Sequence, residues 1–183
     1  MSGAPRRTEA ELAADLHTLL SQALHEDTKR GLCWKLIWDC TELGGRWKNP
    51  NFRWSRRAAN TLLINKNAHR DWFKSLRREH SYPMSLSIGK LIVPGLSLAE
   101  VTKLLGRAAA VAVLHLEEAR AVDGKLKSRL PDGADEWDLD ARYRAVKDPI
   151  IEILPRTARP WEDVPDVAEK VDPDDLEPTP PEA

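Results

Sequence analysis

The chain has 183 residues, and its hydrophobic fraction of 42% is enough for one domain with a core of its own. Its longest apolar run, residues 108–114, is far shorter than the roughly 18 residues of a membrane span, so we expect a cytoplasmic protein without a membrane partner. The net charge of −1 conceals two unequal halves: residues 1–90 carry 16 basic and 9 acidic side chains, and residues 91–183 carry 12 and 20. These halves could bind each other, or the basic half could face an anionic partner.

Two amphipathic helices are predicted at the beginning of the chain, over about residues 8–26 and 29–43. The first opens with a capping box of Thr8 and Glu11, and the second ends at Gly44 and Gly45. The second also carries four residues that we assign to packing: Cys33 and Cys40, which we expect to be reduced, and Trp34 and Trp38, which we place mainly in the core.

Residues 44–80 form a basic and aromatic segment, with ten basic side chains against two acidic ones. We predict a surface loop over residues 45–52, a helix that begins at Ser55 as N-cap, and a further helix over about residues 67–78. The second of these helices would place Trp72 and Phe73 inward and its arginines mostly outward.

Cations interleaved with flat aromatic rings are typical of surfaces that hold phosphates and unpaired bases. Nucleic acid is therefore the partner that this segment favours, with Trp47 or Trp54 as stacking residues. The candidate contact residues are Arg46, Trp47, Lys48, Arg53, Trp54, Arg56, Arg57, Arg70, Lys74, Arg77 and Arg78.

The middle of the chain mixes helical and strand signals. A short apolar stretch over residues 86–93 precedes a second capping box, Ser97 and Glu100, which opens a helix to about residue 105. The apolar run that follows would be the recognition helix of a helix-turn-helix, but it offers nothing to base edges or phosphates. We interpret residues 108–116 as a strand buried on both faces, with a second short strand at residues 149–154.

Glu79 and His80, just before the Pro83 turn, are the candidate catalytic residues. Together with Glu117 and Glu118 after the apolar run, they could form the site of a metal-dependent nuclease if the fold brings them together. The alternative is that His80 caps the end of the preceding helix. Ligand motifs for zinc are lacking, so we expect no metal site and no cofactor, except a divalent metal under the nuclease alternative.

The last third of the chain is acidic. We expect Tyr143 to pack, its neighbours Arg142 and Arg144 to be solvated, and the acidic residues of 132–140 to form a salt-bridged or solvated cover. Residues 156–183 are predicted to be a disordered, acidic, proline-rich tail, either inert or able to bind a protein partner.

Four short patterns resemble a group of uncharacterised proteins from bacteria and their mobile elements. They are the turn at Glu79, His80 and Pro83, the Glu117-Glu118 pair after a strand, the Leu130-Pro131 segment and the Ala141-Arg142-Tyr143 end. The resemblance spans about residues 54–153 and departs from the group at Ser81-Tyr82 and at Leu130, where methionine is usual. It implies a phage or mobile-element origin and no particular reaction.

Taken together, these patterns predict a mostly α (α+β) fold: a helical domain over residues 1–155 with a small two- or three-stranded β element and the tail after it. Within it, about residues 8–80 form the basic, Trp-rich helical part and about residues 84–155 the mixed part. The leading function is a nucleic-acid-associated binding protein. The alternatives are the nuclease and a protein-interaction module or inhibitor of a host machine, and no pattern indicates an oligomeric state.

Overall fold

The protein was analysed as a computed structural model, which describes residues 7–44, 49, 51–64, 72–157 and 160. Within these residues the fold is mostly α, with seven α-helices and one three-stranded mixed sheet, which confirms the predicted fold class. None of the helices in these ranges is long and apolar enough to cross a membrane. The predicted tail beyond Pro160 lies outside the described residues.

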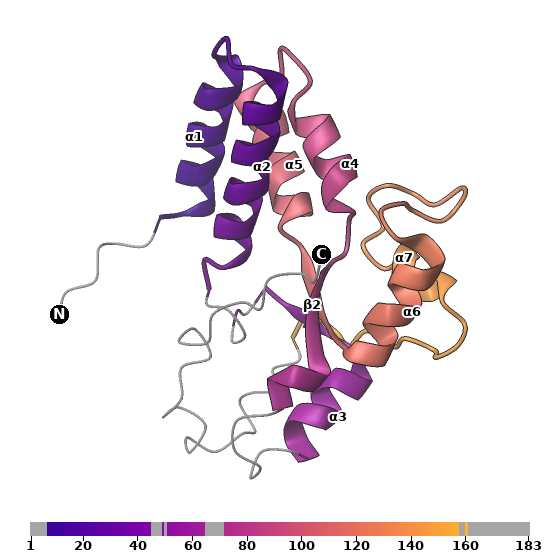
Figure 1. The fold of residues 1–183 in the computed structure, drawn as a ribbon. Coiled ribbons are helices and arrows are strands. Elements are labelled where there is room, and N and C mark those ends of the chain that lie inside the picture. Colours follow the sequence, from indigo (N-terminus) through magenta and orange to yellow (C-terminus); the bar gives the residue numbers. More distant parts are fainter. Residues whose placement is uncertain (1–6, 45–48, 50, 65–71, 158–159, 161–183) are drawn as a thin grey trace, which may run out of the picture.

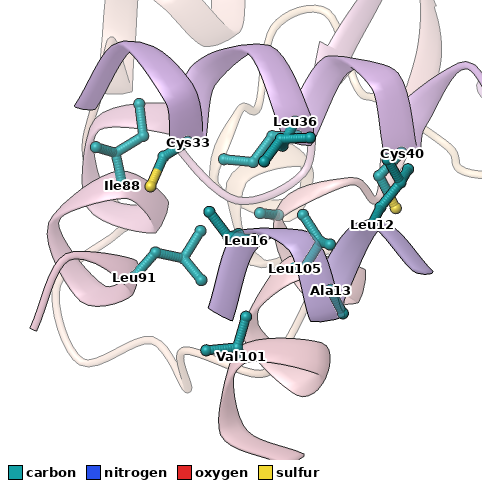
Figure 2. Close-up of a cluster of buried hydrophobic side chains, with 12 residues drawn as sticks. Leu12, Ala13, Leu16, Cys33, Leu36, Cys40, Ile88, Leu91, Val101 and Leu105 are labelled. Atoms are coloured by element: carbon teal, nitrogen blue, oxygen red, sulfur yellow. The ribbon is translucent and has the colours of Figure 1, made fainter. Parts of the chain in front are cut away.

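Four helices form a bundle at one end of the molecule: α1 (Glu9–Ser21), α2 (Glu26–Thr41), α4 (Met84–Leu91) and α5 (Leu98–Ala108) (Figure 1). Both predicted capping boxes are present, at the first turns of α1 and α5. Figure 2 shows the apolar faces of these helices meeting in one buried cluster, in which Leu16, Leu36 and Leu105 lie close together.

Cys33 and Cys40 are free thiols buried in this bundle, as predicted. Burial raises the pKa of Cys33 to about 11 and that of Cys40 to about 12, because the thiolate would lose its hydration. Both sulfurs are therefore protonated packing groups at neutral pH.

The sheet has the strand order β1-β3-β2, with β1 (Arg53–Trp54) parallel and β2 (Leu76–His80) antiparallel to the central β3 (Val111–His115). β3 is shorter than the strand predicted over residues 108–116, because Ala108 ends α5 and Leu116 begins α6. Residues 111–114 are buried, so this part of the apolar run is a two-sided strand and not a recognition helix. One face of β3 packs with Trp54 and α3 (Arg56–Ile64). The other packs with α6 (Leu116–Leu126) and α7 (Ala141–Ala145).

The helix predicted over residues 67–78 is wrong where the chain is described. A short 3-10 turn, Trp72–Ser75, leads directly into β2. Phe73 and Leu76 are three residues apart, a spacing that imitates a helix, whereas β2 alternates between the two faces of the sheet with a period of two. Pairing along the whole of β3 outweighs the local helical preference.

The second predicted strand, residues 149–154, is also corrected. Its end forms backbone bridges beside β1, where Ile153 pairs with Ser55 and the Leu154 N–H donates to the Trp54 carbonyl at 2.8 Å. β1 already occupies the place next to β3, so this segment attaches outside β1 and forms no regular strand.

Candidate functional site

The two central candidates for catalysis, Glu79 and His80, point to opposite faces of the sheet. Glu79 is paired with Ala112 of β3 and His80 with Val111, and directly paired residues share a face. Ala112 faces the α6 and α7 side, whereas Val111 faces the α3 side. The sheet therefore separates carboxylate and imidazole, and in this arrangement the two side chains do not converge on one metal ion or substrate atom.

Glu79 is held by Arg142. The Arg142 side chain is only 2% exposed, so the prediction that it is solvated is wrong. The Arg142 Nη1 donates to Glu79 Oε1 at 2.9 Å and to the His80 carbonyl at 2.8 Å, and Nη2 donates to the Lys127 carbonyl at 2.6 Å. Loss of hydration raises the pKa of Glu79 despite the attraction of Arg142. This buried pair joins α7 to β2.

Tyr143 packs in the interior, as predicted, and adds to the same junction. Its hydroxyl donates to the Glu79 carbonyl at 3.4 Å and lies 3.1 Å from the Ser81 hydroxyl. Arg144, on the outer face of α7, is exposed and paired with Asp138.

On the opposite face, His80 contacts α2 and does not cap a helix. Its Nε2 lies 3.3 Å from the Thr41 hydroxyl, and its ring meets the Trp38 ring edge to face at 4.6 Å. Burial, with the positive charges of Arg78 and Arg142, lowers the pKa of His80 to about 4. The imidazole is therefore neutral at physiological pH.

Glu117 and Glu118 lie in the first turn of α6 and differ in their burial and in their partners. Glu118 is 1% exposed and its Oε2 accepts hydrogen bonds from the His115 N–H, at 2.9 Å, and from the Ser55 hydroxyl. Glu117 is exposed and paired with Arg57. Glu118 thus caps its own helix and ties it to the start of α3. Among the described residues, no group of three or more His, Cys, Asp or Glu side chains is arranged to hold a metal ion.

Only some of the residues predicted to contact nucleic acid lie on the described surface of the protein. Arg46, Trp47, Lys48 and Arg70 lie outside the described residues. Trp54 is 1% exposed and cannot stack on a base, which corrects the prediction, because β1 lies inside the domain. Arg53, also buried, is paired with Asp140, and its Nη2 donates to the Ser81 hydroxyl at 2.8 Å.

The other predicted cations are mostly paired with carboxylates. Three exposed arginines are bound by acidic residues of the second half of the chain: Arg56 by Glu152, Arg57 by Glu117 and Arg77 by Asp123. Arg78 is paired with Glu42 at 2.7 Å, and Lys74 is exposed. The two charged halves therefore do bind each other. The exposed pairs of Arg56, Arg57 and Arg77 contribute only about 0 to 1 kcal/mol each, so a phosphate can exchange with their carboxylates. The Arg78 side chain, in contrast, is mostly buried.

A second aromatic surface, on α2, was missed by the sequence analysis. Trp34 was assigned to the core but is 54% exposed, and its ring meets the Trp38 ring edge to face at 6.1 Å. The Arg78 guanidinium lies 5.1 Å from the centre of the Trp38 ring. Arg30, one turn before Trp34, is exposed on the same helix. We call Arg30, Trp34, Trp38 and Arg78 the Trp stripe.

The sequence held a signal for this stripe. Cys33, Leu36, Ile37 and Cys40 occupy the core face of α2 at spacings of three and four. Trp34 is one residue from Cys33, which turns it about 100° away from that face. Comparisons with protein-family models, curated proteins and solved structures found no match to this chain, and we therefore base its function on the geometry of these side chains.

Proposed function

We propose that the protein binds single-stranded nucleic acid through the Trp stripe. The observation that carries this proposal is Trp34, a large flat side chain that is more than half exposed and meets a second indole, that of Trp38. Arg30 lies one turn before Trp34 on α2, and Arg78 lies over the Trp38 ring. Stacking on an exposed aromatic ring contributes about 1 to 3 kcal/mol for each unpaired base and tolerates any sequence.

The charges around the stripe suit a phosphate backbone that can be released. Arg30 and Arg78 are paired with Glu26 and Glu42, and both carboxylates are exposed. The Arg30–Glu26 pair is exposed on both sides, so a bound phosphate can replace the Glu26 carboxylate and release counterions, and the affinity would fall as salt rises. The Arg78 side chain is only 11% exposed and adds positive charge beside the Trp38 ring.

A single strand fits this geometry better than a duplex. The base faces of a duplex are stacked on each other, whereas an unpaired base can place its face on an indole. The exposed Arg56, Arg57, Lys74 and Arg77 remain candidate phosphate contacts, as do Arg46, Trp47, Lys48 and Arg70, which lie outside the described residues. A cytoplasmic location is part of the proposal.

The test is a fluorescence-anisotropy titration of labelled single-stranded and duplex oligonucleotides at two salt concentrations. Trp34→Leu keeps an apolar side chain but loses the flat face, and we expect it to weaken single-strand binding at least fivefold. Trp34→Phe keeps an aromatic face and serves as the matched variant, with most of the affinity retained. Equal affinity in Trp34→Leu and wild type, or no salt dependence, would refute the proposal and favour a protein partner for this surface.

A further inference from the structure

A second cationic cluster surrounds the end of α5, away from the predicted site residues. It consists of Lys90 on α4 with Lys103 and Arg107 on α5, and it is covered by Glu136 and Trp137 from the connection between α6 and α7. The Arg107 side chain is only 3% exposed. Its guanidinium carbon lies 4.0 Å from the centre of the Tyr82 ring and 4.3 Å from that of Trp137.

Two of the three guanidinium nitrogens of Arg107 lack a hydrogen-bond partner among the described residues. Its Nη1 donates to the Glu136 carbonyl at 3.4 Å and lies 3.6 Å from the Glu136 carboxylate. Its Nε and Nη2 have no hydrogen-bond partner among the residues that the structure describes. These two N–H groups form one edge of the guanidinium, the edge that binds two oxygens of a single carboxylate or phosphate.

The charges of this cluster also favour a bound anion. Two cations, Lys90 and Arg107, share one carboxylate, that of Glu136, and its hydrogen bond from Lys90 lowers its pKa. Lys103 lies against the Trp137 ring, with its Nζ 4.0 Å from the ring centre. The buried Arg142, by contrast, has a carboxylate 2.9 Å away and two carbonyl acceptors. Arg142 lacks a hydrogen-bond partner for its Nε alone, so among the described residues Arg107 is the buried arginine with both groups of the paired edge, Nε and Nη2, unpartnered.

We propose that Arg107, Lys90 and Lys103 bind a terminal phosphate, and that Glu136 and Trp137 form a cover which the phosphate displaces. A terminal phosphate carries close to two negative charges and three oxygens, enough for the guanidinium edge and a lysine together. A phosphodiester inside a strand is flanked by sugars on both sides and does not reach a side chain this deeply buried. With the proposed function, on which this identification of the source rests, the phosphate is the end of the bound strand.

Inorganic phosphate tests the site without any nucleic acid. The Nε–Hε signal of Arg107 in an NMR spectrum, assigned by its loss in Arg107→Lys, is expected to shift saturably as phosphate is added. Arg107→Lys keeps the charge but loses the paired edge, so phosphate binding measured by calorimetry should weaken at least tenfold. Lys103→Gln should weaken it severalfold, and Lys147→Gln, an exposed lysine outside the cluster, should not.

The cover is tested by two variants with the same change of charge. Glu136→Gln removes the carboxylate that competes with phosphate and should strengthen phosphate binding severalfold. Asp132→Asn changes an exposed acid of the same connection and should leave it unchanged. Far-UV circular dichroism of each variant checks that it is folded. Absence of saturable phosphate binding by the wild-type protein, or equal binding by folded Arg107→Lys, would overturn the proposal.

Oligonucleotides with and without a 5′ or 3′ phosphate separate this inference from the proposed function. A terminal phosphate that raises affinity in the wild type but not in Arg107→Lys supports a strand end as the source. If inorganic phosphate binds while Trp34→Leu leaves oligonucleotide binding intact, the phosphate site stands and the stacking proposal fails. If Trp34→Leu weakens oligonucleotide binding and no phosphate binds, the stacking proposal stands and the phosphate site fails.

Discussion

The buried imidazole of His80 makes the stability of this protein depend on pH. Its pKa is lowered from 6.5 to about 4, mainly by burial and then by the charges of Arg78 and Arg142. Because the folded pKa lies below the unfolded one, protonation favours the unfolded chain. The contribution of neutral His80 is therefore fully present above about pH 6.5 and is lost as the pH falls towards 4.

The size of this loss follows from the shift. Each pKa unit corresponds to about 1.4 kcal/mol, so the complete shift corresponds to about 3 kcal/mol. By linkage, about 2 kcal/mol of it is gone at pH 5 and most of the rest at pH 4. That is a large part of the roughly 5 to 15 kcal/mol by which domains of this kind are stable.

Urea unfolding at pH 7.5, 6, 5 and 4 measures the effect. His80→Gln keeps a polar group near Thr41 but does not titrate, so its free energy of unfolding should fall less than that of the wild type, by about 2 kcal/mol at pH 5. The exposed His25, changed to Gln, serves as the control and should keep the wild-type profile. Parallel curves for wild type and His80→Gln would refute the assignment of a neutral, buried His80.

Two further predictions concern stability. Arg142→Met should lower the free energy of unfolding by about 3 kcal/mol, because buried Glu79 loses its hydrogen-bonded partner and keeps only the more distant Arg77, whose Nε lies 3.7 Å away. Arg144→Met on the exposed side of α7 should cost under about 1 kcal/mol. Thermal unfolding would contradict this if the two variants melted together. Glu118→Ala should cost about 1 to 3 kcal/mol through the unpaired Ser55 hydroxyl and His115 N–H, whereas the exposed Glu117→Ala should be nearly neutral; equal urea midpoints would rule out the capping role.

Local signals in the sequence predicted much of the fold. The capping boxes at Thr8 and Ser97 depend on residues three apart, and the buried strand depends on one uninterrupted apolar run. These features are set by neighbours along the chain, so they could be found without knowing the fold. The same holds for the two thiols, whose seven-residue spacing places both on the core face of α2.

The incorrect predictions concern residues whose partners lie far along the chain. β2 is a strand because it pairs with β3, about 35 residues later, although its own residues are compatible with a helix. Arg142 is buried because Glu79 lies 63 positions before it, and no local pattern distinguishes it from the exposed Arg144. The hypothesis that Glu79 and His80 form one site is contradicted for a different reason. They are consecutive residues of a strand, and such residues point to opposite faces of the sheet.

The affinity of the protein for a single-stranded oligonucleotide, measured with Trp34 intact, replaced by Phe and replaced by Leu, tests the proposed stacking function most directly. We predict salt-dependent binding that exceeds duplex binding, is largely kept in Trp34→Phe and falls at least fivefold in Trp34→Leu. Single-strand affinities that are the same in all three proteins would contradict the claim that this exposed indole is a stacking platform.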